Sequence, residues 1–70
     1  MDNEKNIKDL IRIRKKFRAS REQFGRVFLG KSGWAVSNYE RGRTPIPLGI
    51  MMLARAWEQY LDALRGEGRE

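Results

Sequence analysis

Hydrophobic residues recur three and four positions apart in several stretches of the chain, which is the spacing of an amphipathic helix. The first stretch predicts a helix from about residue 4 to residue 17. Arg14 falls inside its apolar stripe, and this cation needs a partner because burying an unpaired charge is costly. The apolar members of the stripe are Ile7, Leu10, Ile11 and Phe17. The remaining surface, either a solvated face or a binding surface, carries Lys5, Lys8, Arg12, Lys15 and Lys16.

A second helix is predicted from about residue 21 to residue 28. Ser20 and Gln23 have the spacing of a capping box, in which each side chain accepts from the backbone N–H of the other. Gly25 costs roughly 1 kcal/mol relative to alanine in mid-helix, so we expect a neighbouring helix to approach closely there. Arg21 places a cation at the amino-terminal end, which is unfavourable unless an anion lies nearby. The side chains expected to face inward are Phe24, Val27 and Phe28.

A third helix is predicted from about residue 33 to residue 41. Ser32 is a preferred N-cap residue, and Gly42 is the residue type that ends a helix in a left-handed conformation. The side chains expected to face inward are Ala35, Val36 and Tyr39. The outer face then consists of Gly33, Trp34, Ser37 and Asn38. A short helix with this exposed face is typical of one that reads base edges in DNA.

Two prolines, Pro45 and Pro47, predict an extended connector, and a last helix follows from about residue 48 to residue 64. Its apolar stripe consists of Ile50, Leu53, Ala54, Trp57, Leu61 and Leu64, widened by Met51, Met52 and Tyr60. This is more apolar surface than one small core absorbs, so we expect a dimer interface here. The candidates for that interface are Met52, Trp57, Tyr60 and Leu64. Residues 66–70 are expected to fray.

Composition narrows the class of partner. The 70 residues form one small domain, and 15 Lys and Arg against 9 Asp and Glu give a net charge of +6. This basic balance favours a polyanionic partner, of which nucleic acid is the commonest. The absence of Cys and His removes thiol and imidazole chemistry and Cys/His zinc sites, so we expect no enzyme, no metal and no cofactor. We expect no signal peptide and no membrane span, and therefore a cytoplasmic protein.

A capped helix, a glycine-containing turn and a second capped helix form a helix-turn-helix. The stretch SREQFGRVFLGKSGWAVSNYERGRTPIP resembles the Cro/cI-type (XRE) helix-turn-helix repressor family, in particular small phage and mobile-element members. The resemblance extends from about Ile7 to about Leu61 and is most specific from Val36 to Gly42. It implies a single all-α domain of four to five helices, similar to that of lambda repressor.

The resemblance also implies a role for individual positions. Ser32 would cap the recognition helix near a phosphate, and Glu40 would form an ion pair with Arg14. Removal of Glu40 is then expected to cost more stability than removal of Glu58, which we expect in an exposed position. The base-reading positions would be Gly33, Trp34, Ser37 and Asn38. The phosphate contacts would come from Arg21, Lys31, Ser32, Arg41 and Arg43.

Two features depart from the family pattern. Gly25 and Gly30 are five positions apart where the family has four, so the second helix or the turn is one residue longer. Trp34 is unusual at a base-reading position. It either contacts a thymine methyl group and sugar edges or folds back against the long turn as part of the core.

The sequence therefore predicts a DNA-binding repressor that acts as a homodimer on a palindromic operator, without a small-molecule effector. One alternative is an antitoxin-like or accessory protein that uses the same fold as a scaffold for another protein. A second alternative is a basic helical protein that binds RNA or a membrane surface. The capped ends and the predicted core argue against this last class, because surface-bound amphipathic helices need neither.

Overall fold

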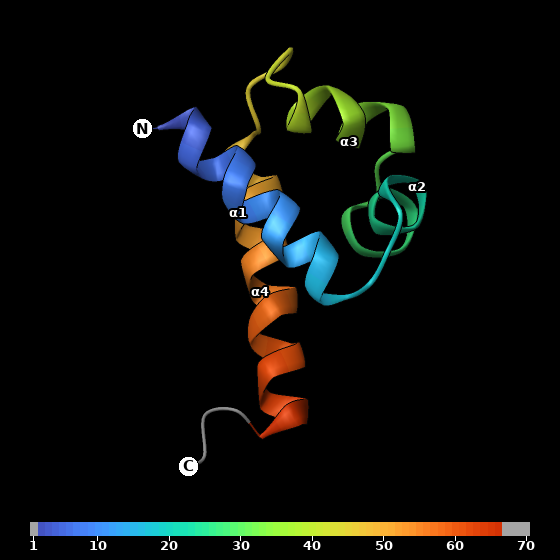
Figure 1. The fold of residues 1–70 in the computed structure, drawn as a ribbon, viewed down its shortest axis with the longest axis vertical. Coiled ribbons are helices and arrows are strands. Elements are labelled where there is room, and N and C mark those ends of the chain that lie inside the picture. Colours follow the sequence, from blue (N-terminus) through green and yellow to red (C-terminus); the bar gives the residue numbers. More distant parts are fainter. Residues whose placement is uncertain (1, 67–70) are drawn as a thin grey trace.

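The chain folds into helices joined by short connections (Figure 1). The computed structural model describes residues 2–66. The elements, in chain order, are α1 (Asn3–Lys16), α2 (Arg21–Gln23), the π-helix η1 (Phe24–Leu29), α3 (Gly33–Glu40) and α4 (Leu48–Arg65). Because α2 continues directly into η1, these elements make four helices, and the described residues contain no strand. The predicted all-α class is confirmed, and each helix begins and ends within one residue of the predicted bounds.

The predicted caps are present at the ends of the central helices. The Ser20 hydroxyl accepts from the Gln23 N–H at 3.1 Å, and the Gln23 side chain accepts from the Ser20 N–H at 3.1 Å. The Ser32 hydroxyl accepts from the Ala35 N–H at 3.1 Å, which fixes the start of α3. Gly42 follows α3 with a φ of 75°, the left-handed conformation that terminates a helix. At the end of α4 Gly66 has a φ of 73°, while residues 67–70 of the predicted frayed tail lie outside the described residues.

The extra residue between Gly25 and Gly30 lies within the helix and not in the turn. The π-helix η1 accommodates this residue, because its backbone hydrogen bonds join residues five apart, whereas those of an α-helix join residues four apart. Side chains five apart then share a face, so Leu29 joins Phe24 in the core. The prediction that Val27 faces inward is wrong, because the wider turn rotates Val27 outward and leaves it 67% exposed.

The core lies where α1, η1, α3 and the first half of α4 meet. Its members are Leu10, Ile13, Phe24, Leu29, Val36, Tyr39, Ile46, Ile50, Met51 and Ala54. Ile13, absent from the predicted stripe, is completely buried because α1 packs against both α3 and α4, whereas Ile11 is only half-buried. The second half of α4 extends beyond the other helices (Figure 1), which leaves Leu64 exposed despite its place in the predicted stripe. Leu53, in the first half of α4, is also exposed, at 40%.

Ion pairs join α1 to α4 between Arg55 and Asp62. Glu58 accepts from Arg12 and, at 3.1 Å, from Lys16, whose ammonium group also donates to Asp62 at 2.7 Å. Asp9 accepts from Arg55 at 3.1 Å. The expectation that Glu58 is exposed is wrong: its side chain is 16% exposed because α1 lies beside this part of α4.

The connector between α3 and α4 is fixed at its centre. Ile46 is buried, and its backbone N–H donates to the side-chain oxygen of Asn3 at 3.2 Å. The start of α1 therefore holds the chain segment that follows α3. This contact limits how far α3 can move relative to α1.

Candidate nucleic-acid interface

The outer face of α3 lies at one end of the molecule, far from the carboxyl end of α4 (Figure 1). Trp34 is 75% exposed, so the structure places it in solvent and excludes its alternative position in the core. Ser37 and Asn38 are half-buried, whereas Val36 and Tyr39 are buried on the inner side, as predicted. The indole ring and two polar side chains are therefore the groups that α3 offers to a partner.

Gly33 does not belong to this outer face. A Cβ atom at Gly33 would lie 2.9 Å from Cα of Glu22, so the residue faces α2 and permits the two helices to pack closely. Gly25 is equally constrained: a Cβ atom there would lie 2.5 Å from the carbonyl oxygen of Lys31 and 2.9 Å from that of Ser32. The close approach expected at Gly25 is confirmed, and Gly33 is reassigned from base reading to packing.

A buried carboxylate ties α3 to the two preceding helices. The Glu40 side chain is 2% exposed, and its Oε2 accepts from Nε of Arg14 at 2.7 Å. Its Oε1 accepts from Nε of Arg21 at 2.8 Å. Arg14 also donates to the carbonyl oxygen of Ala19 at 3.0 Å, which fixes the turn between α1 and α2. The contact between Arg14 and Glu40 is present as predicted.

The contact between Arg21 and Glu40 was not foreseen. The cation at the start of α2 indicated a nearby anion, and Glu40 of the same chain is one such anion. The Arg21 side chain nevertheless remains 46% exposed and uses only Nε in this pair. Together with Arg14, Ser20 and Ser37, it lines an open, polar depression between α2 and α3. Arg21 can therefore hold Glu40 and still present its two Nη groups to an external anion.

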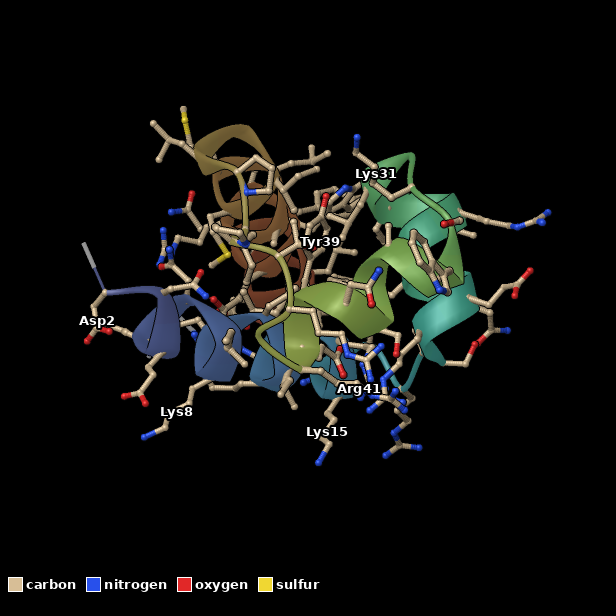
Figure 2. All side chains as sticks on the ribbon, turned by 90° about the horizontal axis from the view of Figure 1, so that it is seen from above. Asp2, Lys8, Lys15, Lys31, Tyr39 and Arg41 are labelled. Atoms are coloured by element: carbon tan, nitrogen blue, oxygen red, sulfur yellow. The ribbon has the colours of Figure 1, made fainter. Side chains whose placement is uncertain are left out.

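Cations flank the outer face of α3 on both sides. Figure 2 looks onto α3 and shows Lys31 at one edge and Arg41 at the opposite edge. Both side chains are exposed, as is that of Arg43, and no ion pair holds any of the three within residues 2–66. Ser32 is also exposed and accepts from Ala35, which leaves its hydroxyl proton for donation. These cationic and hydroxyl groups are therefore available to anions on either side of α3.

Between Met52 and Leu64, α4 carries a separate apolar surface. Three of the four interface candidates, Met52, Tyr60 and Leu64, are each more than half exposed. Trp57 differs from them, because its Nε1 donates to the carbonyl oxygen of Phe28 at 2.9 Å and its ring packs edge-on against Phe28. The side chains that line a shallow apolar hollow here are Leu53, Ala56, Trp57 and Tyr60.

No group of three or more acidic side chains within residues 2–66 is placed to hold a metal ion. None of the helices in that range is both long and apolar enough to cross a membrane. Comparison of the chain with known protein families, with curated proteins and with solved structures found no match.

Proposed function

We propose that this protein is a sequence-specific DNA-binding repressor of the Cro/cI-type helix-turn-helix class that acts in the cytoplasm. The observation that carries the proposal is the outer face of α3, which presents Trp34, Ser37 and Asn38 between the free cations Lys31 and Arg41. An α-helix fits the major groove of B-form DNA, where each base pair presents a distinct pattern of donors and acceptors. The resemblance of residues 20–47 to this repressor class supports the same assignment.

The groups on and around α3 have separate roles in the proposed complex. Asn38 and Ser37 donate to and accept from base edges, and Trp34 makes apolar contact with a thymine methyl group or sugar edges. Lys31, Arg41, Arg43, Ser32 and the free Nη groups of Arg21 bind phosphates. These phosphate contacts supply affinity and orientation but no sequence information, which comes from the side chains of α3.

One recognition helix makes too few base contacts for tight specific binding, so the proposed active form is a homodimer. Two copies of α3 about 34 Å apart read an inverted repeat across one turn of DNA. The apolar surface of α4, with Met52, Tyr60 and Leu64 exposed, supports association of two copies. Repression then results from occupation of a promoter. In the autoregulatory case, this is the promoter of the protein's own gene.

Selection of bound sites from random duplex DNA tests the proposal, because a dimer enriches a palindromic sequence. Mobility-shift titrations of two variants then separate the two kinds of contact. Asn38→Ala is expected to lose discrimination at one or two operator positions, at roughly 1–3 kcal/mol each. Arg43→Ala is expected to weaken binding to all sequences alike and to lower the salt slope by about one unit. If both variants lost affinity equally for operator and for random DNA, Asn38 would not be a base-reading residue.

The apolar hollow on α4, lined by Leu53, Ala56, Trp57 and Tyr60, favours one second candidate. In that case the protein is an antitoxin-like or accessory module, and the hollow receives another protein. Light scattering of the purified chain distinguishes the two functions. A dimer that loses its association in Tyr60→Glu supports the repressor, whereas a stable monomer with no preferred DNA site supports the accessory module.

A further inference from the structure

The basic side chains of α1 fall into two groups that the sequence does not distinguish. Lys5 pairs with Asp9 at 3.4 Å, Arg12 donates to Glu58, and Lys16 donates to Asp62 at 2.7 Å. Lys8 and Lys15 are exposed and form no ion pair within residues 2–66. Although α1 is basic along its whole length, only these two lysines keep their full charge available to a partner.

These two lysines share one side of the molecule. They are seven residues apart, which is about two helical turns and about 10 Å along the axis of α1. Figure 2 shows Lys8 and Lys15 pointing away from the protein along the same edge as Arg41, with Lys31 at the opposite edge of α3. The free cations of α1 therefore extend the charged border of the candidate DNA-binding face along a second helix.

We propose that Lys8 and Lys15 form a second phosphate-binding edge, which contacts the DNA backbone beside the base pairs that α3 reads. This inference rests on the proposed function. Duplex DNA carries one negative charge for about every 1.7 Å of its axis, so two ammonium groups about 10 Å apart meet different phosphates. Each lysine–phosphate contact releases condensed counterions and so makes binding more salt-dependent. A lysine that is already neutralised by a carboxylate contributes little to this salt dependence.

A membrane surface is the other polyanion that free lysines attract. A helix that binds at a membrane surface inserts an apolar face beside its cations. In α1 that face is occupied, because Leu10 and Ile13 are completely buried in the core of the domain. The exposed part of α1 therefore offers two full charges, whereas its remaining apolar side chains, such as Ile11, are only half-exposed, which favours the DNA backbone as the partner.

The experiment compares two double variants that lower the net charge equally, from +6 to +4. Lys8→Gln/Lys15→Gln removes the proposed edge. Lys5→Gln/Arg26→Gln is the control, because both of its cations are exposed and already paired, Lys5 with Asp9 and Arg26 with Glu22. Binding of the full chain to a random-sequence duplex is measured by fluorescence anisotropy over a range of NaCl concentrations. Thermal unfolding of each variant establishes that the fold is retained.

The edge variant is expected to lower the slope of log K against log salt by about two units, about one for each lysine. The control is expected to keep the slope of the unsubstituted protein. Equal slopes for the two double variants would refute the edge while leaving the proposed function intact. If the unsubstituted protein shows no salt-dependent binding to any duplex, both fail. Binding to phosphatidylserine vesicles that only the edge variant loses, with unchanged DNA slopes, would assign the edge to membranes and refute the proposal.

Discussion

Replacement of Glu40 by alanine is the most demanding test of the architecture described above. The substitution removes the one carboxylate that accepts from both Arg14 and Arg21, and its own side chain is only 2% exposed. Arg14 is left with a largely buried guanidinium group, since its side chain is 14% exposed. The unfolded chain solvates the same cation freely, so the loss falls on the folded state alone.

The two contacts differ in the stability that they contribute. Breaking a buried pair such as that of Arg14 costs about 3–5 kcal/mol, because an uncompensated charge remains inside the protein. The contact with the half-exposed Arg21 adds about 0–1 kcal/mol. A 70-residue domain has a total free energy of unfolding of roughly 4–10 kcal/mol. Glu40→Ala therefore removes between about a third of the stability and all of it.

Urea denaturation followed by far-ultraviolet circular dichroism measures the free energy of unfolding of each variant, and thermal denaturation measures its melting temperature. Each kcal/mol lowers the melting temperature by about 4–8 °C in a domain of this size, so Glu40→Ala is expected to melt at least about 12 °C lower. Glu22→Ala is the matched control, because Glu22 forms an exposed pair with Arg26, at side-chain exposures of 63% and 71%. That variant is expected to lose less than about 1 kcal/mol.

Two further variants locate the loss. Arg14→Gln is expected to be strongly destabilised and Arg21→Gln only slightly, because Arg14 is the buried partner. The reasoning is refuted if Glu40→Ala and Glu22→Ala have the same midpoint, or if Arg21→Gln costs more than Arg14→Gln. The first result would mean that the buried pair contributes no more than a surface pair.

Other predictions concern packing and acid stability. Gly25→Ala is expected to destabilise by about 1–3 kcal/mol, because its Cβ would lie 2.5 and 2.9 Å from the two backbone carbonyl oxygens that precede α3. Gly49→Ala is expected to stabilise α4 by about 0.5–1 kcal/mol, because nothing lies within 4 Å of the added carbon. The melting temperatures of the two variants are compared, and equal shifts would refute the close approach of the backbone at Gly25. Two carboxylates are expected to make the protein less stable in acid. The hydrogen bond from Arg55 lowers the pKa of Asp9 below its ordinary value of 3.8. Burial raises the pKa of Glu58, but the hydrogen bonds and charges of Arg12 and Lys16 outweigh this effect and leave its pKa below the ordinary value of 4.5. Since both pKa values are lowered in the folded state, their contribution is complete above these ordinary values and is lost as the pH falls through the folded ones. Denaturation midpoints measured across this range should fall less steeply for Asp9→Asn/Glu58→Gln than for the unsubstituted protein, and parallel curves would contradict this assignment.

Local signals in the sequence were sufficient to predict where the helices begin and end. Ser20, Ser32 and Gly42 act through hydrogen bonds and backbone conformations that involve only their near neighbours. The inward direction of Val27 was mispredicted because a 3.6-residue period was assumed for a segment that forms a π-helix. The spacing of Gly25 and Gly30 revealed an extra residue, but not that the helix would absorb it.

Contacts between distant segments were harder to foresee. The partner of Arg14 was identified through the resemblance to a family, whereas the second partner of Glu40, Arg21, required the relative placement of three helices. The burial of Glu58 depends on α1 lying beside α4, which no local pattern encodes. The same packing separates the paired lysines of α1 from the free ones, so the candidate backbone-binding edge emerges only from the folded chain.

The ion pairs between α1 and α4 also constrain the order in which the protein folds during synthesis. Lys16 and Asp62 are 46 positions apart, and the buried residues Met51 and Ala54 are made late. The segment from α1 to α3 is joined by contacts of α3 with α1 and α2, which can form before α4 is made, but the side of α1 that packs against α4 has no partner until α4 appears. A ribosome-bound chain that stops before α4 is therefore expected to leave part of the buried surface of α1 uncovered and to be a substrate for chaperones and proteases.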